Sequence, residues 1–291
     1  MQDAVPASRP PVSVRASVRG LAVASHLGPT LLVTGLSVAL LVGLRAPLRT
    51  VVVAGAAVLA GQLSVGWSND WIDAERDAAV GRIGKPVVAG VLSRRALRIA
   101  ASGAAAACVV LSLATGALPG SIHLAAVAGA WAYNAGLKGT WCSWVPYSVS
   151  FALLPAFLVL TLPGRTVPAW LWLTGALLGA GAHVANVLPD LEDDAATGVR
   201  GLPHRIGRAG SSVLAPALLV AAAVVVVFGP PGPAGTPRVL GVGLAAVLAI
   251  GAGAIGVVTP HSRRPFTLSM TVAAVCVVLL VAAGPQVVAP G

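Results

Sequence analysis

The chain has 291 residues, of which 57% are apolar and only 10% are charged. A soluble protein of this length carries about a quarter charged residues, so the composition excludes an ordinary soluble domain and predicts a membrane protein. The formal net charge of +10 does not indicate a nucleic-acid partner, because the basic residues lie in short loops between apolar runs, where they orient helices in a bilayer and can bind anionic headgroups or a phosphorylated substrate.

Nine apolar stretches are long enough to cross a bilayer, which takes about 20 residues each. Their approximate ranges are 22–44, 48–70, 97–117, 120–137, 144–162, 168–188, 211–229, 238–258 and 267–284. Backbone polar groups in hydrocarbon must be satisfied within the segment, so these stretches are expected to be helices. The sequence therefore predicts an all-α, multi-pass membrane bundle of about nine transmembrane helices, formed by residues 21–291 as one domain. Residues 1–20 are expected to form a flexible cytoplasmic arm.

The distribution of Lys and Arg predicts the orientation of this bundle. With nine spans and a cytoplasmic N terminus, fifteen of the 19 Lys and Arg residues fall on the cytoplasmic side and four on the other. Basic loops stay preferentially in the cytoplasm. The two longest connections, 71–96 and 189–210, lie on the cytoplasmic side, and functional residues concentrate in such loops. We therefore expect an integral protein of the cell membrane whose active site faces the cytoplasm.

The acidic residues are the most informative feature of the sequence. Apart from Asp3, all of them fall into two groups, which are Asp70, Asp73, Glu75 and Asp77, and then Asp190, Glu192, Asp193 and Asp194. Both groups adjoin helix ends, where a charge that faces lipid costs several kcal/mol. One interpretation is that they are solvated loop charges, but their nearly complete segregation favours a site.

The first acidic group fits a divalent metal site. At about 100° per residue, the side chains of Asn69, Asp70, Asp73 and Asp77 share one face of a helix, while Glu75 points elsewhere. Carboxylates so placed repel one another unless a cation neutralises them. Their hard oxygen atoms suit Mg²⁺, which binds through a few carboxylates together with substrate phosphate.

The second acidic group has a similar pattern. If the segment is helical, Asn186, Asp190 and Asp194 share one face at steps of four residues, and Asp193 lies close in angle. Pro189 can begin a new helix or kink an existing one. Both groups lie at cytoplasmic helix ends, so they can face each other across the mouth of the bundle.

Basic side chains accompany both groups. Arg82 and Lys85 follow the first group, Arg200 and Arg205 follow the second, and Lys138 ends the fourth apolar run. Two carboxylate clusters with surrounding Lys and Arg fit a diphosphate held by bridging Mg²⁺.

These motifs resemble those of the UbiA superfamily of intramembrane prenyltransferases. The signature Asn-Asp-x-x-Asp-x-x-x-Asp is matched by Asn69, Asp70, Asp73 and Asp77, and Asp-x-x-x-Asp is matched by Asp190 and Asp194. Further similarities are Lys85-Pro86 with Gly90, which has Lys where the family has Arg, the stretch from Tyr133 to Lys138, and Gly198–Pro203, where Gly201 replaces a common Ser or Thr.

The resemblance implies nine transmembrane helices around a central cavity, and a prenyltransferase, which is a transferase of alkyl groups other than methyl. It implies Mg²⁺ as the cofactor, and an isoprenoid diphosphate and a hydrophobic acceptor as partners within membrane lipid. The implied catalytic and metal-binding residues are Asp70, Asp73, Asp77, Asp190 and Asp194. The implied substrate-binding residues are Asn69, Arg82, Lys85, Tyr133, Lys138, Asn186, Arg200 and Arg205.

The sequence leaves three functions open. The first is prenyl transfer to an aromatic, quinone-precursor or lipid acceptor. The second is a UbiA-type terpene cyclase, which uses the same metal site without an acceptor. The third is a cation-coupled transporter, which requires charges near the bilayer midplane in broken helices.

Overall fold

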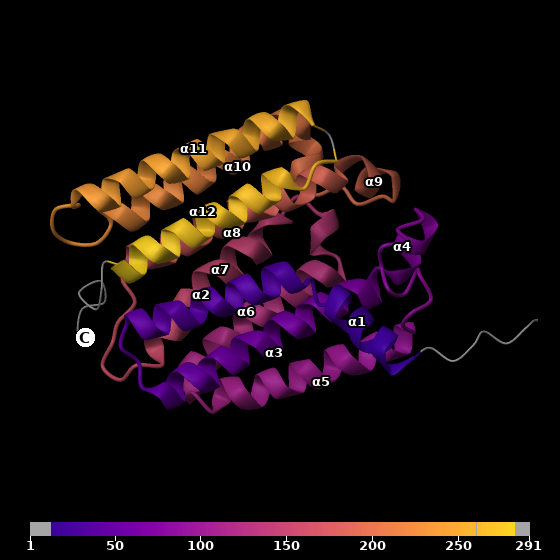
Figure 1. Cartoon of the computed structure of the whole chain (residues 1–291), viewed down its shortest axis with the longest axis horizontal. Helices are drawn as coiled ribbons and strands as arrows, with labels where there is room; N and C mark the ends of the chain where they lie inside the picture. Colours follow the sequence, from indigo (N-terminus) through magenta and orange to yellow (C-terminus); the bar gives the residue numbers. More distant parts are fainter. Residues whose placement is uncertain (1–12, 260, 283–291) are drawn as a thin grey trace, which may run out of the picture.

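A computed structural model describes residues 13–259 and 261–282 of the chain. Throughout this part the secondary structure is helical and contains no strand, which confirms the all-α class (Figure 1). The helices are α1 (Val14–Ala24), α2 (Leu27–Gly43), α3 (Leu48–Ile72), α4 (Ala74–Ala79), α5 (Arg94–Leu113), α6 (Ala117–Ala135), α7 (Trp144–Leu160), α8 (Ala169–Val187), α9 (Leu191–Ala196), α10 (Leu202–Phe228), α11 (Thr236–Val258) and α12 (Arg264–Ala282). Two 3₁₀ turns, η1 (Leu137–Gly139) and η2 (Leu188–Asp190), follow α6 and α8.

The long helices run side by side and form a membrane bundle (Figure 1). In the described residues, six helices are long and apolar enough to cross a bilayer, and a seventh span results if α1 and α2 count as one bent span. The six are α3, α5, α8 with its continuation to Ala196, α10, α11 and α12, whereas α7 is apolar but shorter. The membrane bundle is thus confirmed, and the number nine stays a prediction.

The first predicted span, 22–44, is wrong as one continuous helix. The chain bends by 65° between α1 and α2, and His26 at the bend has a left-handed backbone with φ of 52°. Tertiary contacts hold α1 against α3, because the Trp67 indole N–H donates to the Leu21 carbonyl at 2.9 Å. Of the predicted arm, residues 1–12 lie outside the described residues and residues 14–20 belong to α1.

Helix α8 occupies the centre of the bundle. It contacts α7, α10 and α12, and twelve of its nineteen residues are buried. Gly175 and Gly179 face α7 so closely that any side chain at Gly175 would meet the Phe151 carbonyl and any at Gly179 the Tyr147 carbonyl. Small residues at four-residue spacing let membrane helices approach to backbone contact. This packing fixes the position of the polar segment that follows α8.

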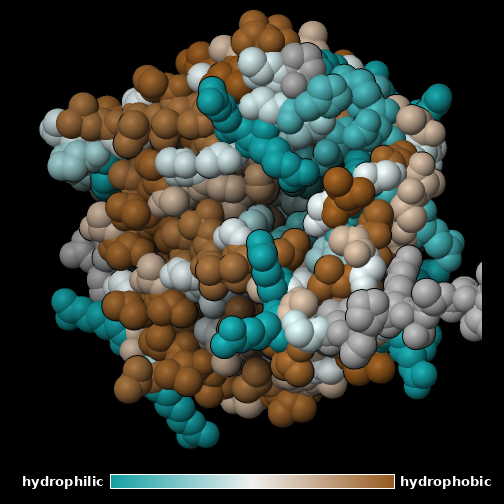
Figure 2. Space-filling model, turned by 45° about the vertical axis from the view of Figure 1, so that its right-hand side comes forward, coloured by the Kyte–Doolittle hydropathy of each residue, from teal (hydrophilic) through white to brown (hydrophobic). Residues whose placement is uncertain are grey.

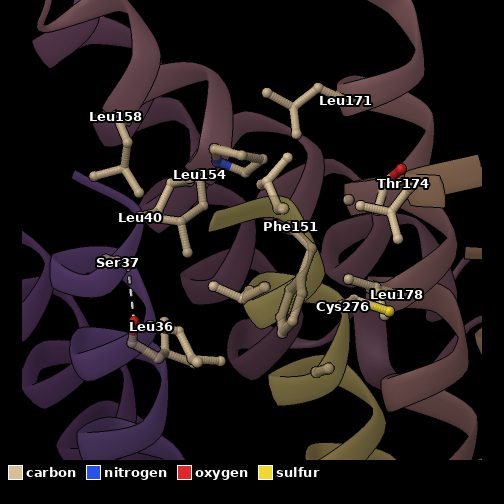
Figure 3. A pocket seen from close by; sticks show the side chains of 17 residues that line it. Leu36, Ser37, Leu40, Phe151, Leu154, Leu158, Leu171, Thr174, Leu178 and Cys276 are labelled. Carbon is tan, nitrogen blue, oxygen red and sulfur yellow. Dashed lines mark hydrogen bonds between the residues drawn. The ribbon is translucent and has the colours of Figure 1, made fainter. Parts of the chain in front are cut away.

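An apolar cavity of about 90 Å³ lies between α2, α7, α8, α10 and α12. Its wall includes Leu36, Leu40, Phe151 and Leu178, whose side chains converge in Figure 3. The hydroxyl of Thr174 also lies at this wall, but it donates to the backbone carbonyl of Trp170 at 2.8 Å. The cavity is therefore lined almost wholly by hydrocarbon. It lies within the bundle, where the sequence resemblance implied a central cavity.

The acidic side chains of the described residues gather at one end of the bundle. The short helices α4 and α9 both lie at that end (Figure 1). In the space-filling view, hydrophilic residues surround a hollow on this end, while much of the flank is apolar (Figure 2). An apolar flank is what a lipid-facing surface requires.

Candidate functional site

The two acidic groups meet at this end, and Arg82 joins them. The Arg82 guanidinium donates to Asp77 Oδ1 at 3.2 Å through Nη1 and to Asp194 Oδ1 at 3.1 Å through Nη2. A single guanidinium therefore spans the gap between carboxylates that are 117 positions apart (194 − 77). The predicted meeting of the two groups across the mouth of the bundle agrees with this geometry.

The sequence predicted that the first acidic group lies on one uninterrupted helix, but the structure interrupts this helix. Helix α3 ends at Ile72, Asp73 is its C-cap, and α4 begins at Ala74. The backbone hydrogen bonds nevertheless keep a four-residue step, because the Asp73 N–H donates to Asn69 and the Asp77 N–H donates to Asp73. Three carboxylates consequently stay on the inner side and are buried, with exposed fractions of 2% for Asp70, 6% for Asp73 and 2% for Asp77.

Asp70 is held by two side chains from other segments. The Lys85 ammonium donates to Asp70 Oδ1 at 2.5 Å, and the His26 Nε2 atom lies 3.2 Å from the same oxygen. Lys85 is one of the predicted substrate-binding residues. The contact with His26 depends on the bend between α1 and α2, which the sequence did not show.

Asp73 carries the most buried ion pair of the site. Lys138 Nζ lies 2.5 Å from both carboxylate oxygens, Arg76 Nη2 lies 2.6 Å from Oδ2, and the Asn69 amide donates to Oδ2 at 3.2 Å. Asn69 also donates to the Asn134 amide oxygen at 3.3 Å, which ties α3 to α6. Burial lowers the pKa of the Lys138 ammonium, and the charge of Asp73 opposes this effect.

Burial also raises the pKa of the Asp77 carboxyl, while Lys85 and Arg82 oppose that rise. Burial alone would lower the pKa of Arg82, but Asp190 and Asp194, together with Asp77, raise it above its ordinary value. An arginine between carboxylates stays fully charged. The mouth of the bundle therefore combines fixed positive charge with acidic groups that are partly removed from water.

The second acidic group is less buried than the first. Helix α8 ends at Val187, the 3₁₀ turn η2 contains Pro189, and α9 begins at Leu191. The turn η2 thus interrupts the continuous helix on which the predicted shared face of Asn186, Asp190 and Asp194 depends, and that shared face stays a prediction. Asp190 lies 3.7 Å from Arg263. The Asn186 amide donates to the Tyr147 hydroxyl at 3.4 Å.

Aromatic rings line the inner side of this acidic region. The Tyr133 ring packs edge-on against Tyr147 at 5.1 Å and against His183 at 5.6 Å between centroids. The His183 Nε2 atom lies 3.0 Å from the Ser143 hydroxyl, whose oxygen accepts a bond from the Leu202 N–H at 2.9 Å. Tyr133 was predicted from the sequence as a site residue. The positions of Tyr147 and Ser143 beside the site depend on how α7 packs, and no pattern in the sequence indicates them.

Two predicted substrate-binding residues remain apart from the acids. Arg200 is exposed in the loop after α9, and Arg205 is exposed in the first turns of α10. Neither forms an ion pair with any residue that the structure describes. Their substrate-binding role stays a prediction.

The carboxylates that the structure describes at the mouth of the bundle do not by themselves form a closed site for a divalent cation. In the described residues no three His, Cys, Asp or Glu side chains converge to enclose a metal ion, because each buried carboxylate of the site points at a Lys or Arg. The donors are nevertheless hard carboxylate oxygens from two segments that Arg82 joins. Mg²⁺ needs only one or two protein carboxylates when substrate phosphates and water complete its coordination. The residues therefore fit Mg²⁺ together with a diphosphate rather than a closed protein site.

The sequence was compared with models of known protein families and with curated protein sequences. The model of the UbiA prenyltransferase family matches residues 27–275. A search of curated protein sequences gives no significant match.

Several solved structures share the fold. A UbiA homologue from Archaeoglobus fulgidus bound to GPP and Mg²⁺ is 15% identical, with a TM-score of 0.67 over 90% of this chain and 99% of that chain. A UbiA homologue from Aeropyrum pernix K1, in its apo form, is 16% identical, with a TM-score of 0.72 over 88% of this chain and 98% of that chain. A structure concerning digeranylgeranylglyceryl phosphate synthase is 16% identical, with a TM-score of 0.65 over 93% and 99% of the two chains.

Proposed function

The chain belongs to the UbiA prenyltransferase family, and from this premise we propose that it transfers a prenyl group from an isoprenoid diphosphate to a hydrophobic acceptor, with Mg²⁺ as cofactor. The observation that carries the proposal is the junction at Arg82, which brings the Asp77 and Asp194 carboxylates from two distant segments together. A diphosphate needs positive charge on both sides, and paired carboxylate groups with Lys and Arg are the groups that supply it through metal ions and directly.

The residues proposed to hold Mg²⁺ are Asp70, Asp73, Asp77, Asp190 and Asp194. When bound, Mg²⁺ would supply positive charge that stabilises the leaving diphosphate. The support from known structures is that the Archaeoglobus fulgidus homologue of the same fold is bound to GPP and Mg²⁺.

The proposed reaction is a substitution at an allylic carbon. The bond between that carbon and the diphosphate oxygen breaks, and the electron pair leaves with the diphosphate. A new bond forms between the carbon and the acceptor, which loses a proton. Lys85, Lys138 and Arg82 provide fixed positive charge near the departing group, and fixed charges of this kind stabilise charge that develops in a transition state.

We propose that the buried aromatic rings stabilise the allylic cation. The rings of Tyr133 and Tyr147 lie beside the acidic region, and an aromatic face attracts a cation. The apolar cavity of about 90 Å³ lies farther along α8 and can hold hydrocarbon. An apolar surrounding also keeps water from the reactive cation. We propose that the site opens to the cytoplasm, on the basis of the distribution of Lys and Arg.

The test is diphosphate release by the full chain in lipid, with Mg²⁺, a panel of isoprenoid diphosphates and added acceptors. We expect D70N and D190N to lower the rate at least a hundredfold. The matched control is E75Q, which removes one acidic charge from the same segment at a side chain that is 83% exposed. It should keep most of the activity.

The products decide among the functions. Release that requires an acceptor and gives a prenylated product supports the proposal. Release without an acceptor, with a cyclic hydrocarbon as the product, would replace the transferase with a cyclase. No release from any diphosphate, or equal losses in D70N and E75Q, would overturn the proposed site.

A further inference from the structure

A second site, which is basic, lies beside the acidic candidate functional site, on the flank formed by α3 and α5. It is an open hollow of about 450 Å³ lined by the indole of Trp71 and by the side chains of Arg94, Arg95 and Arg98. The three arginines come from the first turns of α5, which begins at the N-cap Ser93. None of them contacts the buried aspartates of the candidate functional site.

The charge of this hollow is mostly uncompensated. Arg94 pairs with Glu75, whose side chain is largely exposed. Arg95 and Arg98 are exposed and form no ion pair with any residue in the described ranges 13–259 and 261–282. Three like charges within two helical turns repel one another. An anionic ligand that contacts the guanidinium groups would relieve this repulsion.

The surroundings of the hollow are those of a membrane boundary. Ile99, which follows Arg98 on α5, is 61% exposed, and farther along the same helix Val110 is 68% exposed, so exposed apolar side chains extend along α5 from the arginines. Trp71 presents an indole at the rim, and this side chain is typical of the headgroup level of bilayers. A ligand here would therefore have its charged group at the hollow and an apolar part along α5.

Helix α1 adds a second membrane-boundary element next to the hollow. It is attached through a small apolar cluster that includes Ala24, Leu92, Leu97 and Trp71. Its outer face mixes exposed valines with exposed arginines, which are Val14, Arg15, Val18 and Arg19. A helix with this mixture that bends away from the direction of its neighbouring span is typical of a helix lying in the headgroup layer.

We propose that the hollow lined by Trp71, Arg94, Arg95 and Arg98 binds the phosphate headgroup of an anionic phospholipid. Arginine forms paired hydrogen bonds with phosphate oxygens, and the acyl chains would extend along the apolar surface near Ile99. A lipid is favoured over a soluble phosphate because the charged hollow and an exposed apolar surface are contiguous. This inference does not depend on the transferase reaction.

The experiment is native mass spectrometry of the full chain in micelles with equal amounts of phosphatidylglycerol and phosphatidylcholine. We expect retained phosphatidylglycerol on the wild type, and about a 25-fold lower affinity with a correspondingly reduced occupancy for R95Q/R98Q, since each basic residue near an anionic membrane surface is worth about fivefold in affinity. R95K/R98K should keep most of the occupancy. The matched control is R45Q/R49Q, which removes two exposed arginines from the opposite end of the bundle and should leave it unchanged.

Each result bears on the proposal. Preference for phosphatidylglycerol that R95Q/R98Q abolishes and the control keeps supports it, provided that the thermal unfolding temperature is unchanged. Equal retention of both lipids, equal losses in the two double variants, or no loss in R95Q/R98Q would overturn it. Displacement of the lipid by millimolar inorganic phosphate would also overturn it, because the hollow would then be a site for soluble phosphate.

Discussion

The close packing of α8 on α7 leads to a sharp prediction about Gly179. A methyl group added at Gly179 would lie 2.7 Å from the carbonyl carbon of Tyr147 and 2.8 Å from Phe151 Cβ, whereas ordinary contacts are 3.4–4 Å. The contact partners include backbone atoms of another helix, which a change of side-chain rotamer cannot move. The change G179A therefore requires α7 and α8 to separate by several tenths of an ångström.

Two opposing effects determine how much G179A changes the free energy of unfolding. Alanine is a better helix former than glycine by about 1 kcal/mol, and overpacking in a close-packed interior costs about 1–3 kcal/mol. We expect a net loss of up to about 2 kcal/mol for G179A. For a chain of this size a loss of about 2 kcal/mol lowers the unfolding temperature by about 4–8 °C. Gly251 in α11 is the matched control, because a methyl group there meets nothing within 4 Å.

The assay is thermal unfolding of both variants in the same detergent. G179A should unfold at a lower temperature than the wild type, and G251A at the same or a higher temperature. Since the contact is with Tyr147, whose ring packs against His183 at 5.1 Å, G179A should also lower the rate of diphosphate release. Shifts of equal sign and size in the two variants would refute the argument from packing.

Three further predictions concern the site. K138Q should lower the unfolding free energy by about 3 kcal/mol, because it leaves a buried carboxylate without its main partner, and the double variant D73N/K138Q should recover part of this loss in thermal unfolding. G201A should lower diphosphate release several-fold in steady-state assays, because a methyl group at Gly201 would lie 2.6 Å from both the Lys138 carbonyl and the Ser143 hydroxyl; G84A, which meets no atom within 4 Å, should keep the wild-type rate. Chelation with EDTA should abolish diphosphate release, which added Mg²⁺ should restore; activity that survives chelation would contradict the proposed role of the carboxylates.

Much of the fold could be predicted from hydropathy, but its bends could not. Bilayer length and apolar content place the helix ends of α8 and α11 within about two residues of the predicted spans 168–188 and 238–258. The bend at His26 follows instead from tertiary contact, since Gly66 lets the Ser25 carbonyl approach α3 so closely that a methyl group at Gly66 would lie 2.7 Å away. Such an approach depends on two distant segments, and hydropathy does not contain it.

In the candidate site, too, the sequence predicts some features, whereas others depend on the tertiary structure. The spacing of Asp70, Asp73 and Asp77 predicts a shared inner face, and the face exists although the helix breaks at Asp73. The role expected for Asn186 stays a prediction, because the 3₁₀ turn after α8 lies between it and Asp190. In the first group the four-residue backbone hydrogen bonds continue across the break at Asp73. In the second group Pro189 removes a backbone donor at the point where α8 ends, so the spacing alone does not show how Asn186 and Asp190 lie relative to each other.

The course of α8 connects the apolar cavity to the second acidic group. Its middle turns contribute Thr174 and Leu178 to the apolar cavity, its last turns contribute His183 to the aromatic cluster, and the chain then enters the second acidic group at Asp190. At 1.5 Å per residue, these features extend over about 24 Å, which is most of a bilayer's hydrocarbon thickness. The second acidic group and the apolar cavity are therefore positioned by one helix and the short turn that follows it. Any change that moves α8 against α7 must alter both, and this is why packing at Gly179 and chemistry at the carboxylates are expected to fail together.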